Sequence, residues 1–86
     1  MNEKINEKVS VVTVFDREKR TVTPRKIKWQ GRLYTIEKIG YHHKVKQGKK
    51  LLHIFSVCNN SLAFKLEFDT ETLFWTLTEV SDGLAS

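Results

Sequence analysis

The chain is poor in cysteine, proline and glycine, and it contains no long apolar run. It has one cysteine, Cys58, one proline and four glycines among 86 residues. A single cysteine excludes an internal disulfide and a cysteine-rich zinc site. The glycines are scattered singly, so no glycine-rich phosphate loop is present. No apolar stretch reaches the roughly 18 residues that a membrane span needs, and we expect no membrane partner.

Acidic residues are scarce in the middle of the chain. Between Arg17 and Lys50 there are twelve lysines and arginines against two acids, whereas residues 51–86 carry one base against five acids. The net charge is +5. This asymmetry is typical of two oppositely charged segments that neutralise each other in the fold, or of a protein with one positive face for an anionic partner.

The length and the termini predict one small domain. A chain of 86 residues has room for one hydrophobic core. We expect the domain to span residues 9–80, with flexible ends at residues 1–8 and 81–86. Residues 1–8 are polar and do not resemble a secretory signal, so we expect a cytoplasmic protein.

Strand signals occur almost throughout. Short β-branched or alternating segments separated by turn residues predict strands at residues 9–15, 25–29, 32–46, 51–58, 62–69 and 73–80. Short turns between them favour antiparallel pairing. The predicted fold is all-β: a small antiparallel meander, as a curled sheet or an SH3-like barrel of five to six strands, with or without one short helix.

The alternation also predicts which side chains face the core. We expect residues 51–58 to have apolar side chains on both faces, and four other segments to have one inward apolar face, formed by Ile27, Trp29, Tyr34, Ile36, Leu62, Phe64, Leu66, Phe68, Leu73, Trp75 and Leu77. In the long third segment the phase changes, so that Ile39 and Tyr41 would rejoin the core. A bulge near Glu37 and Lys38, or a bend at Gly40, would produce that change.

A hairpin motif carries a resemblance. The order Trp29-Gln30-Gly31-Arg32-Leu33-Tyr34, followed by the strands at residues 64–69 and 75–80, resembles small uncharacterised bacterial β-domains with a W-x-G-R-x-Y hairpin. The resemblance covers roughly residues 24–82. It implies an all-β fold, and it implies no activity and no catalytic residue.

Two histidines are candidates for a metal site. If Gln47 and Gly48 form a two-residue turn, His42 lies opposite His53, and a three-residue turn would pair His43 with His53 instead. Zinc or nickel normally takes three or four protein ligands, and Cys58 is several residues along the strand. We therefore predict surface or half-buried histidines, no metal site and no cofactor.

The sequence does not indicate an enzyme. Cys58 ends an apolar strand and resembles a small hydrophobic residue rather than an activated nucleophile. Glu67, Asp69 and Glu71 fall on an outward face or in a turn, where acids mainly keep a domain soluble. We predict no catalytic residues.

A basic strip is the strongest candidate site. Two neighbouring hairpins would present seven cationic side chains: Lys26, Lys28, Arg32, Lys44, Lys46, Lys49 and Lys50. Such a strip would bind the phosphates of DNA or RNA, with an exposed ring such as Tyr41 or Phe74 stacking on a base. The alternative interpretation of these lysines is a solvated strand face that discourages edge-to-edge pairing.

The second functional hypothesis is a protein-interaction module. Phe74, Val12 and Val14 would form an apolar surface for another protein or for a second copy of the chain in a homodimer. Salt discriminates the two hypotheses, because nucleic-acid binding weakens steeply with salt and apolar association does not.

Overall fold

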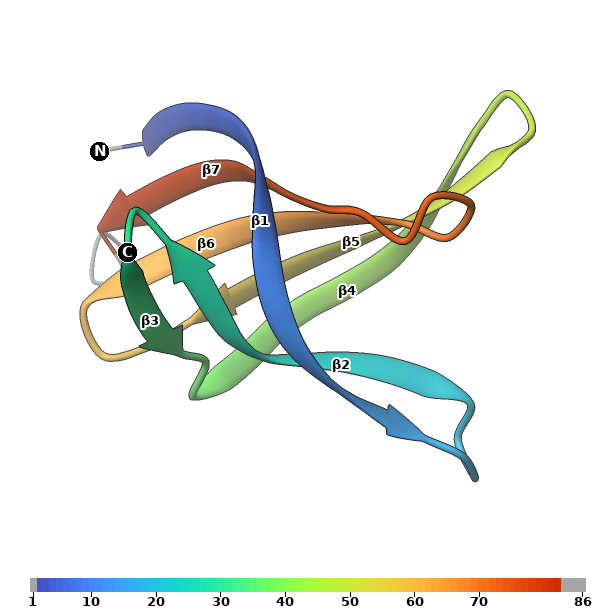
Figure 1. Ribbon diagram of the computed structural model, residues 1–86, viewed down its shortest axis with the longest axis horizontal. Helices are drawn as coiled ribbons and strands as arrows, with labels where there is room; N and C mark the ends of the chain where they lie inside the picture. The colour runs from blue at the N-terminus through green and yellow to red at the C-terminus, as the bar shows by residue number, and fades with distance from the viewer. Residues whose placement is uncertain (1, 83–86) are drawn as a thin grey trace.

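The computed structural model describes residues 2–82, which form one antiparallel sheet of seven strands and no helix. The strands follow each other as β1 (Asn2–Asp16), β2 (Thr21–Trp29), β3 (Arg32–Thr35), β4 (Lys38–Gln47), β5 (Lys50–Cys58), β6 (Leu62–Asp69) and β7 (Trp75–Asp82). Their order across the sheet is β3-β2-β1-β7-β6-β5-β4. β1 therefore joins the two halves, and β3 and β4 are the two edges (Figure 1).

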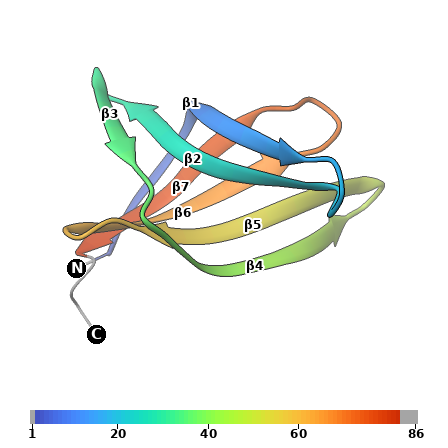
Figure 2. The same cartoon turned by 90° about the horizontal axis from the view of Figure 1, so that it is seen from below.

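The sheet curls on itself without closing into a barrel. The register shifts between Val12 and Thr13 in β1, between Ile39 and Tyr41 in β4, and at two further places on β1 and β6. Bulges of this kind increase the local twist and bend a sheet. Figure 2 shows β1 and β2 bent over β5 and β6. The two edge strands, β3 and β4, do not pair with each other, so the sheet stays open between them.

The loop between β3 and β4 ties the two edges together at one end. The backbone N–H of Ile36 donates to the Arg25 carbonyl of β2 (2.8 Å), and that of Glu37 donates to the Cys58 carbonyl of β5 (3.0 Å). Ile36 itself is buried in the core. Apolar side chains therefore fill this end of the curl. At the other end, the β1–β2 turn and β4 are not joined by strand pairing.

The core fills the concave side of the curl. Its buried members come from β2, the β3–β4 loop, β5, β6 and β7: Ile27, Ile36, Phe55, Val57, Phe64, Leu66, Trp75, Leu77 and Val80. Trp29, Tyr34, Leu62 and Phe68 are partly buried and pack against them. The inward faces predicted for the second, fifth and sixth segments are confirmed, apart from Leu73.

Short turns carry the polar residues that such turns need. Asp16 and Asp69 end a strand and Asn59 directly follows one, and each accepts two backbone N–H groups through Oδ1 at 2.7–3.2 Å. Gln30 and Gly31 both have positive φ (52° and 74°), as the type I′ turn of a two-residue hairpin requires. The predicted turn at Gln30-Gly31 is confirmed.

Several predictions about the fold are corrected. The all-β class and the curled antiparallel sheet are confirmed, but the sheet has seven strands rather than five or six and does not close as a barrel. The segment 32–46 is two strands, because the chain leaves the sheet at residues 36–37 to cross between its edges. Ile39, Tyr41 and Leu73 are exposed rather than in the core, and Leu73 has a positive φ of 67° in the β6–β7 turn.

The ends of the domain also differ from the expectation. Residues 2–8 form the first half of β1 and pair with β7, where a flexible N-terminus was predicted. β7 continues to Asp82. The rest of the predicted flexible tail, residues 83–86, lies outside the described residues.

Candidate anion-binding mouth of the curled sheet

The open end of the curl holds a cavity of about 330 Å³, which we call the mouth. Its lining comes from the β1–β2 turn and the start of β2 on one side, and from β4, β5 and β6 on the other: Lys19, Arg20, Thr21, Val22, His42, Lys44, His53, Phe55, Phe68 and Thr70. Residues more than twenty positions apart in the sequence are thus brought together by the bend of the sheet.

Three cations line the mouth, and none of the described lining residues is acidic. Lys19 and Arg20 project from the β1–β2 turn, whose shape is set by Asp16 accepting the N–H groups of Glu18 and Lys19 (2.9 and 3.1 Å). Arg20 has a positive φ of 55°, which turns the chain into β2. Lys44 faces them from β4. An anion entering here meets positive charge from both sides.

The register of the β4–β5 hairpin places the histidines. Gln47 pairs with Lys50, so the turn is Gly48-Lys49 and not Gln47-Gly48. Lys44 is then opposite His53, and His42 is opposite Phe55. Both predicted pairings of His53, with His42 and with His43, are wrong. His42 and His53 still share the concave face as diagonal neighbours.

The rings of His42 and His53 meet side by side. A hydrogen bond of 2.8 Å joins Nε2 of His42 and Nδ1 of His53, with the rings 18° from parallel and their centroids 5.0 Å apart. The His42 ring also stacks on Phe55, with centroids 4.2 Å apart and 2° between the planes. The two imidazoles therefore form a nearly flat pair, backed by Phe55, on the β4–β5 side of the mouth.

Burial lowers the pKa of both imidazoles, and the Lys44 ammonium lowers each further. Charge repulsion from His43 adds to the effect on His42, and repulsion between His42 and His53 adds to that on His53. Both rings are therefore mainly neutral at pH 7. A neutral pair can share one proton, with one ring donating and the other accepting, whereas a doubly protonated pair has no acceptor.

We expect acid to destabilise the fold through this pair. The pKa of each ring in the folded state is below the value of 6.5 in the unfolded chain. The unfolded chain therefore binds more protons as pH falls below 6.5, and stability present above that pH is lost. Thermal unfolding at pH 7.5 and pH 5 should give a lower melting temperature at pH 5, and a smaller drop for the His42→Asn/His53→Asn variant. An equal drop in both proteins would contradict this account.

The structure separates the seven cations of the predicted basic strip. β2 and β3 lie at one edge of the sheet and β4 and β5 at the other. The β2–β3 turn, which Arg32 follows, and the β4–β5 turn are at opposite ends of the molecule (Figure 1). Lys26 and Lys28 are exposed and alternate with the buried Ile27, so they lie on the outer face of β2.

The β4–β5 hairpin divides its own lysines. Lys44 lines the mouth, and Lys46 follows two residues later on the same face of β4. Lys49 is in the turn, and Lys50 lies on the outer face, where its Nζ is 3.5 Å from Asp69 Oδ2. Of the seven, Lys44 alone lines the mouth. The other two cations of the mouth are Lys19 and Arg20 of the β1–β2 turn, which are not part of the predicted strip.

The predicted stacking rings, Tyr41 and Phe74, are exposed but do not line the mouth. Tyr41 lies against His43, with ring centroids 4.8 Å apart, on the face of β4 opposite to His42. Phe74 lies in the β6–β7 turn, beside Lys8, whose Nζ is 5.7 Å from the ring centroid. The aromatic rings that do line the mouth are Phe55 and Phe68.

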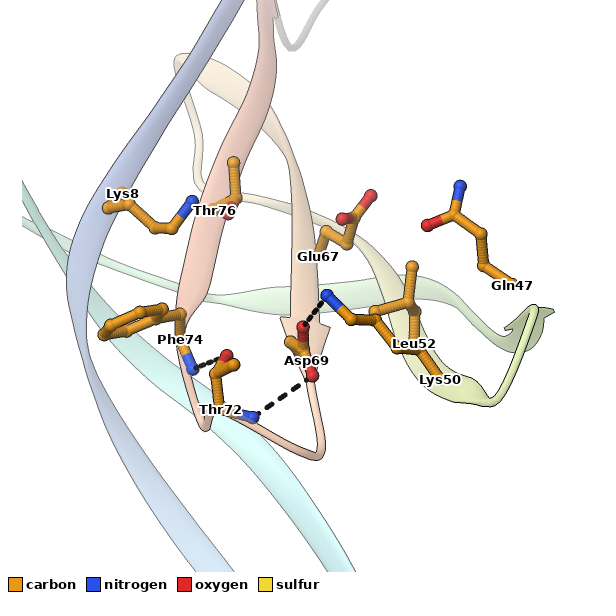
Figure 3. A pocket seen from close by; sticks show the side chains of 9 residues that line it. All are labelled: Lys8, Gln47, Lys50, Leu52, Glu67, Asp69, Thr72, Phe74 and Thr76. Atoms are coloured by element: carbon orange, nitrogen blue, oxygen red, sulfur yellow. Dashed lines mark hydrogen bonds and ion pairs between the residues drawn. The ribbon is translucent and has the colours of Figure 1, made fainter.

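A second cavity, of about 340 Å³, lies on the outer face (Figure 3). Its charges neutralise each other, since Lys8 and Lys50 line it together with Glu67 and Asp69. Backbone N–H groups of Glu71 and Thr72 and the Lys50 ammonium hold the pKa of Asp69 below its usual value. This carboxylate therefore stays ionised and repels an anion, so the outer cavity is a weaker candidate than the mouth.

Within residues 2–82, no three histidine, cysteine or acidic side chains lie close enough together to hold a metal ion. The His42–His53 pair therefore has no third protein ligand among these residues. None of the described residues belongs to a helix that could cross a membrane.

Comparison with family models, with curated proteins and with solved structures finds no match to this chain.

Proposed function

We propose that this domain is a non-enzymatic binding module for single-stranded nucleic acid, with the mouth as its principal contact. One observation carries the proposal. Lys19, Arg20 and Lys44 surround a cavity that also contains aromatic rings, and its described lining has no acid. Non-specific binding of single strands combines these two elements, cations for the backbone and rings for the bases.

The overall charge distribution supports the same ligand class. The chain carries a net charge of +5, and the basic residues cluster between Arg17 and Lys50. Lys46 and Lys49 extend the positive region from Lys44 along the β4–β5 hairpin. A flexible single strand can follow this hairpin after entering the mouth. DNA and RNA are both compatible with contacts to phosphates and base faces.

The proposal is tested by fluorescence anisotropy of a labelled single-stranded oligonucleotide titrated with the protein at 50 mM and 200 mM salt. We expect saturable binding at low salt that weakens steeply at the higher concentration, because each phosphate contact contributes about −0.7 to the slope of log K against log salt. No binding at 50 mM salt would overturn the proposal, as would binding that salt does not change.

Exposed apolar side chains favour one alternative, a protein-interaction module that includes self-association. Val12, Val14 and Leu33 are exposed on β1 and β3. The edges formed by β3 and β4 are unpaired within the described sheet, and an unpaired strand edge can accept a strand from a partner. The same protein examined by light scattering would then form dimers that persist at 200 mM salt and dissociate when Val12 is replaced by a charged residue.

A further inference from the structure

The size of the mouth limits what can enter it. Its volume of about 330 Å³ is at the small end of the roughly 300–1,000 Å³ typical of ligand pockets. The β1–β2 turn bounds it on one side and the β4–β5 hairpin on the other. A pocket of this size accommodates one ligand of the size of a nucleotide and not a stretch of duplex.

The polar groups of the mouth suit a phosphate. Lys19 and Arg20 come from one wall and Lys44 from the other, so an anion between them is held from two directions. The hydroxyl groups of Thr21 and Thr70 are part of the same lining. Thr70 Oγ1 donates its proton to the Leu51 carbonyl at 2.8 Å, which fixes the side chain. The hydroxyl therefore has no proton left to donate to an anion. The charge-assisted contacts therefore come from the three cations.

The flat groups of the mouth suit a base. The His42–His53 pair and the rings of Phe55 and Phe68 line one side of the cavity. The two imidazoles are joined by their 2.8 Å hydrogen bond, and His42 is stacked on Phe55, so this surface is already ordered before a ligand arrives. An ordered ring surface stacks on a base at little entropic cost.

We infer that the mouth is a subsite for one nucleotide unit, with the phosphate between Lys19, Arg20 and Lys44 and the base against the His42–His53 pair and Phe68. The inference rests on the proposed function and specifies it, since the mouth takes a single unit of the bound strand. It also predicts that a free nucleoside monophosphate occupies the same place.

The experiment compares three probes: adenosine 5′-monophosphate, adenosine and inorganic phosphate. Each is titrated into the protein at 50 mM salt while the ring signals of His42 and His53 are followed by NMR, and each is also used to displace a labelled oligonucleotide. We expect the monophosphate to bind at least about tenfold more tightly than phosphate or adenosine, because it alone uses both parts of the mouth.

Matched variants locate the two contacts. Arg20→Gln should weaken the monophosphate and inorganic phosphate alike, whereas Lys28→Gln, on the outer face of β2, should leave both unchanged. His42→Ala should weaken the monophosphate and leave phosphate nearly unchanged. His43→Ala, at the adjacent position on the other face of β4, serves as its control. Equal effects of the two histidine variants would overturn the assignment of the base.

The outcomes separate the inference from the proposed function. Binding of the oligonucleotide that the monophosphate cannot displace would overturn the subsite and leave the proposed function standing. A monophosphate that binds no more tightly than phosphate would also overturn the subsite, because the mouth would then recognise charge alone. Absence of binding to both the oligonucleotide and the monophosphate would overturn both.

Discussion

Replacing Phe64 with alanine should lower the free energy of unfolding by about 3–5 kcal/mol, the usual cost of deleting a buried phenylalanine side chain. Phe64 is 2% exposed and lies near the start of β6, between Val57 of β5 and Val80 of β7. Its ring also meets Tyr34 from the other edge of the sheet, with centroids 5.4 Å apart. The substitution thus removes buried apolar area, and it also removes a ring contact between two strands that are far apart in the sheet, β6 and β3.

This loss is large for a domain of this size. At roughly 0.05–0.15 kcal/mol per residue, the whole stability of a domain of 86 residues is about 4–13 kcal/mol. We therefore expect a strongly lowered urea midpoint, and partial unfolding without denaturant. Phe15→Ala is the control, since that ring is 63% exposed and its removal should cost about 0.5 kcal/mol or less. Similar midpoints for the two variants would contradict the assignment of the core.

Charge reversal in the mouth should have the largest effect on binding. The Lys19→Glu/Arg20→Glu variant replaces two of the three cations of the mouth with acids and leaves Lys44 facing them. We expect it to weaken oligonucleotide binding at 50 mM salt by well over tenfold, or more than about 1.4 kcal/mol. The slope of log K against log salt should also fall by about 1.4, which corresponds to the loss of two phosphate contacts.

The matched control reverses two positive charges on β2, the strand that follows the β1–β2 turn. Lys26→Glu/Lys28→Glu alters the net charge equally but lies on the outer face of β2. If the mouth is the contact, this variant should weaken binding only slightly, through the long-range field. If net charge alone decides, both variants should weaken binding to the same extent. Circular dichroism of each variant establishes that the sheet is intact.

Local patterns in the sequence predict most of the sheet. The strict alternation of Leu62, Phe64, Leu66 and Phe68 gives the inward face of β6, and Gln30-Gly31 gives the β2–β3 turn. These features depend on neighbours in the chain, so the sequence contains them directly. The exposed side chains of Val12 and Val14 on β1 are also as the alternation predicts.

Local patterns do not predict the register of the β4–β5 hairpin. Gly48 has a positive φ of 63°, and a turn at Gln47-Gly48 or at Gly48-Lys49 would both place this glycine in the turn. The sequence does not choose between them. Moving the turn by one residue changes the partner of His53 but keeps His42 and His53 on one face, because the side-chain period of a strand is two residues. The two rings therefore meet despite the wrong register.

The composition of the mouth could not be predicted from the sequence. Lys19 and Arg20 look like an ordinary charged turn, and only the bends at the bulges of the sheet bring that turn opposite Lys44. Bulges are weakly marked in sequence, since they need one extra residue and no particular side chain. The same bending places Lys26, Lys28 and Arg32 away from Lys44, which divides the predicted strip.

The most direct test of the account is an NMR map of the backbone amides as a single-stranded oligonucleotide is added at 50 mM salt. The account predicts saturable shifts that are largest at Arg20, Thr21, Lys44 and His53, on both walls of the mouth. Largest shifts at Lys26 and Lys28, on the outer face of β2, would contradict it, and so would the absence of saturable shifts anywhere in the domain.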